Sequence, residues 1–139
     1  MADVDVRELA KYRMQSARER FAAAQVLLEN GLFRDAISRA YYAVFQAARA
    51  ALATKSLDAR KHSGVVSLFI QHFVKPGILP KEYGKILKST KDLRHASDYD
   101  DFYLVTKEEA REAVEKAGRF LDGIAEFLEK ANWGQVSDN

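Results

Sequence analysis

The chain has 139 residues, 47% of them hydrophobic and 30% charged, which is typical of one globular domain over residues 1–139. Its formal net charge of +2 is too balanced for a protein that mainly neutralises phosphates, although a local basic patch is compatible with it. The absence of cysteine excludes disulfides, thiolate metal sites and cysteine nucleophiles. No apolar run approaches the roughly 20 residues that span a bilayer, and the acidic N-terminus does not resemble a signal peptide, so we expect a cytoplasmic protein.

Apolar residues recur at helical spacing along most of the chain, which predicts an all-α protein. The first helix is expected from about Asp5 to Asn30, because Gly31 readily adopts the left-handed conformation that ends helices. The second is expected from about Phe33 to Thr54, with a stripe of large apolar residues and a seam of small ones. The seam comprises Ala36, Ala40, Ala43, Ala47 and Ala50. Such a helix lies centrally in a bundle, or contributes to both a core and a dimer interface.

Three further helices are expected after a polar loop. Residues 65–74 are predicted to form a short helix, and Pro80 suits the first position of the next one. Thr106 and Glu109 form a capping box that begins the last helix, which continues to about Lys130. Together the elements predict an antiparallel up-and-down bundle of four to five helices. Its core extends over about residues 5–130, and residues 131–139 form a loose tail.

The stretch LRHASDYDDFY is the first candidate site. Arg94 borders the buried stripe of its helix, and Asp98 lies on the same face one turn later, as Tyr99 does relative to His95. Aspartates at a helix C-terminus oppose the helix dipole, and such unfavourable local choices are enriched at functional sites. Alternatively, the helix ends near Ser97 and the aspartates lie in a solvated loop.

Two other groups of polar residues are candidates for binding or catalysis. Arg39, Tyr42 and Arg49 lie along one strip of the second helix, where they offer two cations and a phenol to a phosphate or an acidic partner, or only solvate that face. His62 is a surface residue, a helix-start residue or a general base, whereas His72 lies in an apolar run and is expected to be partly buried. The histidine spacing does not predict a metal site, and no phosphate-binding loop or serine-hydrolase motif occurs.

The segments RDAISRAYYAVFQAARAAL, KHSG and LRHASDYDD together resemble the HEPN family (higher eukaryotes and prokaryotes nucleotide-binding domain), in particular its small stand-alone prokaryotic branch. The resemblance covers about residues 8–130. It implies a bundle of four or five helices that usually pairs as a homodimer, with a polar site near the dimer cleft. It also implies a minimal nucleotidyltransferase as partner in a toxin–antitoxin-like module.

Active members of the family are metal-independent ribonucleases, so the resemblance also implies a catalytic motif. In that motif an arginine holds the phosphate, and a later histidine acts on the ribose 2′-hydroxyl as general base. Arg94 and His95 match the first two positions of the motif. Tyr99, Asp100 and Asp101 occupy the window in which the catalytic histidine is expected.

Three functions therefore remain open. The first is a nucleotide- or partner-binding module without a cofactor, in which Tyr99 is also a site for nucleotidyl modification by the partner. Its cleft would be formed by Arg39, Tyr42, His62, Arg94, His95, Asp98 and Tyr99. The second is a metal-independent ribonuclease in which Arg94 holds the phosphate and His62 or Tyr99 acts as the base. The third is a non-catalytic helical dimer that depends on the second helix.

Overall fold

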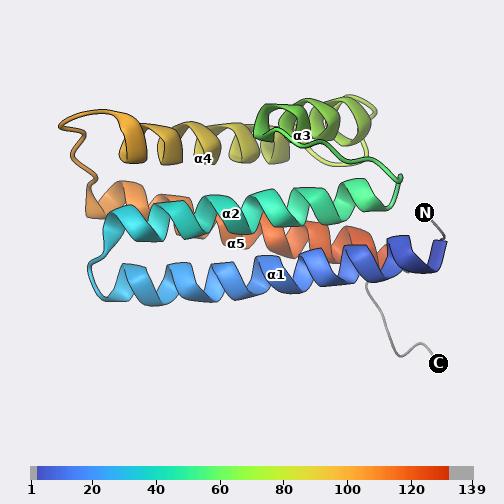
Figure 1. Ribbon diagram of the computed structural model, residues 1–139, viewed down its shortest axis with the longest axis horizontal. Helices are drawn as coiled ribbons and strands as arrows, with labels where there is room; N and C mark the ends of the chain where they lie inside the picture. The colour runs from blue at the N-terminus through green and yellow to red at the C-terminus, as the bar shows by residue number, and fades with distance from the viewer. Residues whose placement is uncertain (1–2, 132–139) are drawn as a thin grey trace.

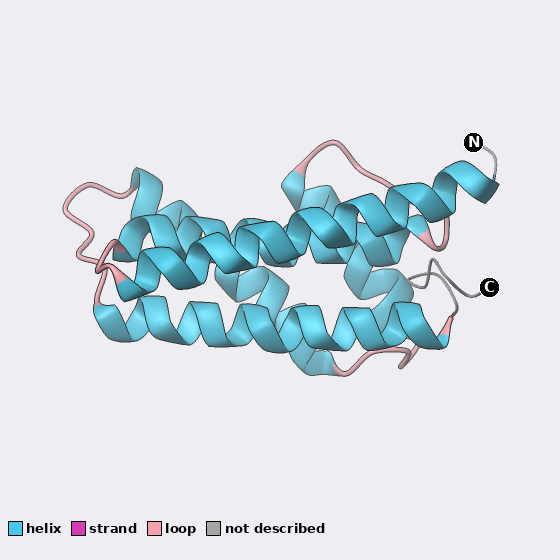
Figure 2. Ribbon diagram, turned by 90° about the horizontal axis from the view of Figure 1, so that it is seen from below, coloured by secondary structure: helices cyan, strands magenta, loops and turns pink. Residues whose placement is uncertain are grey.

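The structure, a computed structural model, describes residues 3–131, with side chains from residue 6 onward, and these residues are helices joined by loops without any strand (Figures 1 and 2). The elements in chain order are α1 (Asp3–Glu29), α2 (Phe33–Ala53), α3 (His62–Phe69), the π-helix η1 (Ile70–Val74), α4 (Lys81–Tyr99) and α5 (Lys107–Lys130). The all-α prediction is confirmed. Apart from Ala131, the predicted loose tail lies outside the described residues.

The four long helices α1, α2, α4 and α5 run alternately in opposite directions, as the sequence predicts (Figure 1). Helix α3 and η1 lie beside the first half of α4. Within the described part of the chain, no helix combines the length and the apolar character needed to cross a membrane.

Helix α2 is the centre of the bundle, because it contacts α1, α3, α4 and α5. The alanine seam of α2 is completely buried, as are Ile37, Tyr41 and Leu52 from its stripe of larger residues. Alanine side chains let neighbouring helices approach closely, so three long helices pack around α2. The central position predicted for this helix is confirmed, and its contribution to a dimer interface stays a prediction.

Local sequence signals set the helix ends. Gly31 has a φ of 77°, and the bonds Gly31 N–H to Leu28 C=O (3.1 Å) and Leu32 N–H to Leu27 C=O (2.9 Å) form a Schellman motif that ends α1. The capping box of Thr106 is present at the start of α5.

The ends of α4 differ slightly from the expectation. Pro80 is the N-cap and lies one position before the helix, because its ψ of 155° is extended. At the other end α4 continues past Ser97 to Tyr99, so Asp98 belongs to the helix. Asp100 and the residue that follows it are exposed in the turn beyond.

Helix α3 continues into η1 without a break. The Lys75 N–H donates to the Ile70 carbonyl at 2.8 Å, which is the i to i+5 bond of a π-helix. Phe69 and Phe73 are fully buried and stack on each other with ring centroids 5.5 Å apart, which anchors both segments to the core. His72 is half-buried, as predicted.

Enlarging the alanine seam tests the central role of α2. Ala47→Leu should lower the free energy of unfolding by about 1–3 kcal/mol, because Ala47 is completely buried and its surroundings leave no room for the larger side chain. Ala22→Leu on the exposed face of α1 is the matched control and should change it by less than about 0.5 kcal/mol. Urea denaturation measures both variants, and equal values would contradict the proposed packing.

Candidate functional site

The candidate site lies where α2, α3 and α4 meet, and its base consists of aromatic side chains. Tyr41 is fully buried, and its hydroxyl lies 2.8 Å from Nδ1 of His62, the first residue of α3. The Phe45 ring packs on the imidazole with centroids 4.2 Å apart, and the Tyr42 ring approaches it edge-on at 5.8 Å. Because a buried tyrosine hydroxyl requires a hydrogen-bond partner, the contact with Tyr41 fixes the position of His62.

Arg94 of α4 lies against the same tyrosines. Its guanidinium carbon is 5.4 Å from the ring centroid of Tyr41, 5.5 Å from that of Tyr42 and 5.8 Å from that of Tyr99. Its Nη1 donates a hydrogen bond of 3.2 Å to Oδ2 of Asp98, and its side chain is 13% exposed. Its Nε is buried without a hydrogen-bond partner among the described residues, so the electron-rich tyrosine faces are its polar environment.

These residues form what we call the Arg94 cluster. The cluster comprises Tyr41, Tyr42, His62, Arg94, Asp98 and Tyr99. The spacing in the sequence predicts the pairing of Arg94 with Asp98, which the structure confirms. The sequence left open whether His62 approaches Arg94, and the structure brings the two side chains onto the same tyrosine, Tyr41.

Charge and burial determine the protonation of the cluster. Burial lowers the pKa of His62 below its ordinary value of 6.5. Three positive charges act in the same direction, those of Arg94, Lys91 and Arg49. The imidazole is therefore neutral at pH 7, and the phenol of Tyr41 keeps its proton because burial raises its pKa. Nε2 of His62 is a free base when Nδ1–H donates to the Tyr41 hydroxyl oxygen, and it carries the proton when the hydroxyl donates instead.

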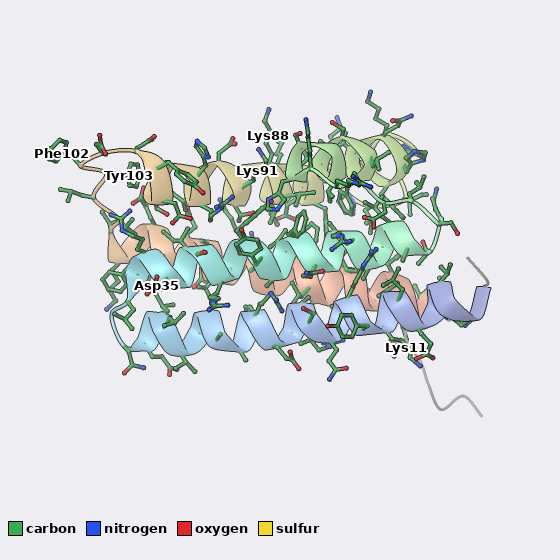
Figure 3. The ribbon with its side chains drawn as sticks, in the orientation of Figure 1. Lys11, Asp35, Lys88, Lys91, Phe102 and Tyr103 are labelled. Atoms are coloured by element: carbon green, nitrogen blue, oxygen red, sulfur yellow. The ribbon has the colours of Figure 1, made fainter. Side chains whose placement is uncertain are left out.

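The outer edge of the cluster is open to solvent. The rings of His95 and Tyr99 lie 4.9 Å apart, which confirms the second predicted pair on α4. Tyr99 is 64% exposed, so its hydroxyl is accessible. Beyond it, Phe102 is 98% exposed in the turn between α4 and α5, at the end of the molecule (Figure 3).

The predicted strip on α2 is brought together only in part. Tyr42 belongs to the Arg94 cluster, as its contacts with Arg94 and His62 show. Arg49 lies over the ring of Phe45 at 5.7 Å, but its guanidinium is bound to a carboxylate. Arg39 is exposed, and among the described residues it has no hydrogen bond or ion pair.

The carboxylate bound by Arg49 is that of Asp58, in the loop that leads from α2 to His62. Arg49 donates to it through Nε at 3.3 Å and Nη2 at 3.1 Å, and Arg13 of α1 donates through Nη2 at 3.0 Å. Although burial raises the pKa of Asp58, these hydrogen bonds, the Ala59 N–H and the charge of Arg13 lower it overall. The two arginines thereby hold the loop that presents His62 to the cluster.

Several of these residues were not identified as site residues in the sequence. Tyr41 falls in the stripe of large apolar residues on the second helix, although a tyrosine at a buried position indicates a nearby polar partner. Arg13 is only 6% exposed, and its partner Asp58 lies 45 positions away. No local pattern reports such a contact, so these two residues could not have been found from spacing.

The Arg94 cluster offers a fixed cation, a neutral imidazole and accessible aromatic rings. A guanidinium recognises phosphate oxygens, and a neutral imidazole can accept a proton or donate a hydrogen bond. No three His, Asp or Glu side chains converge as a possible metal site among residues 6–131. The cluster is therefore suited to binding a phosphate group.

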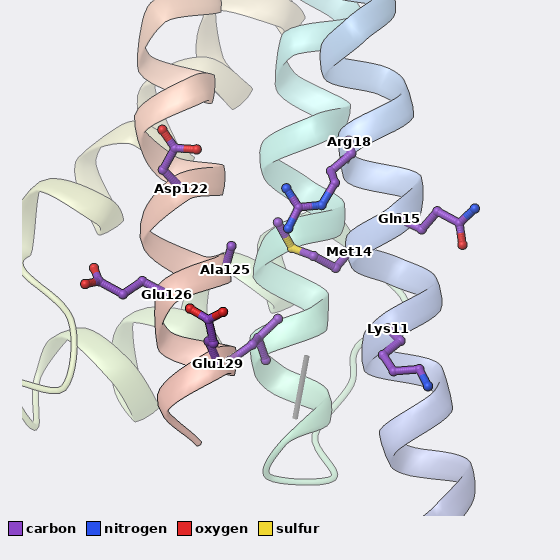
Figure 4. Close-up of a pocket in the computed structure, with 9 residues that line it drawn as sticks. Lys11, Met14, Gln15, Arg18, Asp122, Ala125, Glu126 and Glu129 are labelled. Carbon is purple, nitrogen blue, oxygen red and sulfur yellow. The ribbon is translucent and has the colours of Figure 1, made fainter. Parts of the chain in front are cut away.

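A second concave surface lies between α1 and α5, with a volume of about 520 Å³ (Figure 4). It carries basic side chains from α1, Lys11 and Arg18, and acidic ones from α5, Asp122, Glu126 and Glu129. No histidine or tyrosine lines it. This mixture of charges with an apolar floor lacks the convergent polar groups of a specific site.

Nuclear magnetic resonance titration of the histidines tests the arrangement of the cluster. We expect His62 to titrate below 6.5, and we expect its pKa to rise in Arg94→Gln because a nearby positive charge is removed. Arg39→Gln removes an exposed arginine from α2 and should leave this pKa unchanged. An identical His62 titration in the wild type and Arg94→Gln would show that the two side chains are not neighbours.

The chain is similar to known proteins along nearly its whole length. The HEPN domain model matches residues 10–128. A protein of Methanocaldococcus jannaschii named "putative toxin" is 40% identical over 126 residues, which cover 91% of this chain and 93% of that protein. A UPF0332 protein of Thermotoga maritima is 35% identical over 122 residues, which cover 88% of this chain and 92% of that protein.

The domain match spans α2, α3 and α4, the helices on which the Arg94 cluster is built. The extent of the domain match and the identity of relatives aligned along almost all of their length show that this chain belongs to the HEPN domain family.

Proposed function

We propose that this chain is a single-domain, toxin-like HEPN module whose Arg94 cluster binds a phosphate group of a nucleotide or an RNA. The observation that carries the proposal is that Arg94 and His62 both contact Tyr41, Arg94 over its ring and His62 at its hydroxyl. The guanidinium provides the charge for the phosphate, and the exposed rings of His95 and Tyr99 provide faces on which a base can stack.

The relatives named "putative toxin" support the toxin-like part of this proposal. In the cell the module would act in the cytoplasm as a homodimer, with the Arg94 cluster near the dimer cleft and a minimal nucleotidyltransferase as its partner. The family resemblance supports this assembly. An exposed Tyr99 beside Arg94 would give such a partner an accessible hydroxyl to modify.

Binding of two probes tests the main proposal, AMP and a labelled 12-nucleotide single-stranded RNA. Arg94→Ala should weaken the binding of both by roughly tenfold or more, because a hydrogen bond to a charged group contributes about 1.5–3 kcal/mol. Arg39→Ala is the matched control and should bind like the wild type, since Arg39 lies outside the cluster. Equal affinities of wild type, Arg94→Ala and Arg39→Ala would leave the helical scaffold as the better description.

Metal-independent RNA cleavage is the second candidate, and the lowered pKa of His62 beside Arg94 favours it. In this reaction the imidazole takes the proton of a ribose 2′-hydroxyl, whose oxygen attacks the adjacent phosphorus. The 5′-oxygen of the next nucleotide takes up the proton that the imidazole carries and leaves as a hydroxyl, and a 2′,3′-cyclic phosphate remains.

Purified protein should then cleave RNA in the presence of EDTA, and Arg94→Ala and His62→Ala should each lower the rate by about 100-fold or more. Tyr99→Phe tests the other candidate base and should retain the rate if His62 is the base. Cleavage that is equal in wild type and Arg94→Ala would come from a contaminant, and it would rule out this candidate for the isolated protein.

Modification of Tyr99 tests the proposed partnership. If a minimal nucleotidyltransferase is encoded beside this chain, incubation with that enzyme and ATP should join AMP to the Tyr99 hydroxyl oxygen and release pyrophosphate. Mass spectrometry of the tryptic peptides should find the added AMP in the wild type and not in Tyr99→Phe, while Tyr103→Phe should still be modified because Tyr103 is less exposed. Unmodified Tyr99, or the absence of such a neighbouring gene, would contradict the partnership.

A further inference from the structure

The small net charge of the chain conceals an uneven distribution. Residues 55–94 carry nine Lys and Arg against three Asp and Glu, a formal charge of +6. The rest of the chain carries 13 basic and 17 acidic residues, a formal charge of −4. The positive segment comprises α3, η1, most of α4 and the loops that flank α3 and η1, and its Lys and Arg residues lie in α4 and in those loops. Helices α3, η1 and α4 lie side by side on one face of the bundle (Figure 1).

A groove with a volume of about 510 Å³ lies between α3–η1 and α4 on this positive face. Lys75 lies at the end of η1, while Lys88 and Lys91 lie on α4, and all three line the groove together with one acidic residue, Asp92. Figure 3 shows Lys88 and Lys91 on the side of the molecule opposite Lys11. The groove also presents neutral hydrogen-bonding groups, those of Ser63, Ser67 and Gln71.

One end of the groove lies next to the Arg94 cluster. Ser63 lines the groove and directly follows His62 in α3. Lys91 also lines it, lies one helical turn before Arg94 on the same face of α4, and has a charge that acts on His62. A chain of phosphates bound to the lysines would therefore continue towards Arg94.

We propose that this groove binds the sugar–phosphate backbone of a single-stranded RNA and leads it to the Arg94 cluster. A positively charged groove that follows the backbone, next to aromatic rings on which bases stack, is the arrangement by which proteins hold single strands. Here the lysines provide the positive charge of the groove, and the exposed rings of His95 and Tyr99 provide faces on which bases can stack. This inference rests on the proposed function, because it requires that the Arg94 cluster binds a phosphate group of the strand.

The composition of the groove favours a single-stranded nucleic acid over a protein partner. Protein interfaces are depleted in lysine and enriched in aromatic residues at their centre, whereas this groove has three lysines and no aromatic residue. Its apolar residues, Val66 and Ile70, are half-buried at its base. Adjacent helices pack about 8–10 Å apart, so a groove between them admits a flexible strand and not a duplex.

Fluorescence anisotropy with labelled oligo(U) of 12 nucleotides tests the groove. The variant Lys75→Gln/Lys88→Gln removes two exposed charges from it and should weaken binding roughly five- to 25-fold at about 0.1 M salt. The slope of log affinity against log salt concentration should become less steep by about 1.4, because each phosphate contact to a single strand contributes about 0.7.

The variant Lys11→Gln/Lys130→Gln is the matched control, because it changes the net charge equally on the face formed by α1 and α5. It should bind like the wild type. If both double variants weaken binding to the same extent, only the net charge matters and the groove assignment is overturned. Urea midpoints equal to that of the wild type are required of both variants, so that lost binding does not report lost folding.

Three further binding measurements identify the class of ligand and distinguish failure of the groove proposal from failure of the proposed function. Equal affinity for oligo(dU) of 12 nucleotides would overturn the choice of RNA over DNA, and equal affinity for poly-glutamate would overturn the choice of a nucleic acid. If Arg94→Ala loses binding while the groove variant binds normally, the groove proposal fails and the proposed function stands. If the groove variant loses binding while Arg94→Ala binds normally, the strand is held without the Arg94 cluster and the proposed function fails.

Discussion

The hydroxyl group of Tyr41 lies inside the bundle, where an unpaired polar group would destabilise the fold by about 1–3 kcal/mol. His62 satisfies it, and the contact ties the loop after α2 and the start of α3 to the central helix. The same ring forms part of the surface on which the guanidinium of Arg94 lies, so one buried tyrosine positions both an imidazole and a cation. The requirement to satisfy one hydroxyl in the core therefore determines the geometry of the candidate site.

The alanines of α2 make this arrangement possible, because they bring the neighbouring helices close enough to bury Tyr41 completely. The pairing of Asp58 with Arg13 and Arg49 then holds the loop from the side of α1. Removal of Asp58 would leave these two arginines, whose positive charges repel each other, without their shared carboxylate in a partly buried position. The geometry of the Arg94 cluster thus depends on the ion pairs of Asp58, which do not involve Arg94 itself.

Local patterns in the sequence were sufficient for most of the fold. The seam at Ala36 to Ala50 predicted the central helix, Gly31 predicted the end of α1, and Thr106 predicted the start of α5. The pairs on α4 followed from their spacing of one turn. Contacts between distant segments could not be predicted in this way, because spacing within a helix does not report which residues meet across the fold. Arg13, for example, bonds to the Arg49 carbonyl 36 positions away and to Asp58 45 positions away.

The charge of the chain illustrates the same limit at a larger scale. A net charge of +2 indicates little affinity for phosphates, yet residues 55–94 carry a formal charge of +6, and their basic residues lie in α4 and in the loops that flank α3 and η1, which pack together. Glutamates and aspartates balance them elsewhere, in particular along α5. Folding places many basic and many acidic residues on different faces of the bundle, so the net charge of the chain describes neither face.

The π-helix η1 has a consequence for how this surface can vary among sequences. A π-turn contains one residue more than an α-turn, and each residue advances an α-helix by about 100°. Because the wider π-turn absorbs the extra residue, loss of one residue from Ile70–Val74 would restore a regular α-helix and leave Lys75 on nearly the same face. A sequence that is one residue shorter at this point can therefore keep both the core and the charged surface.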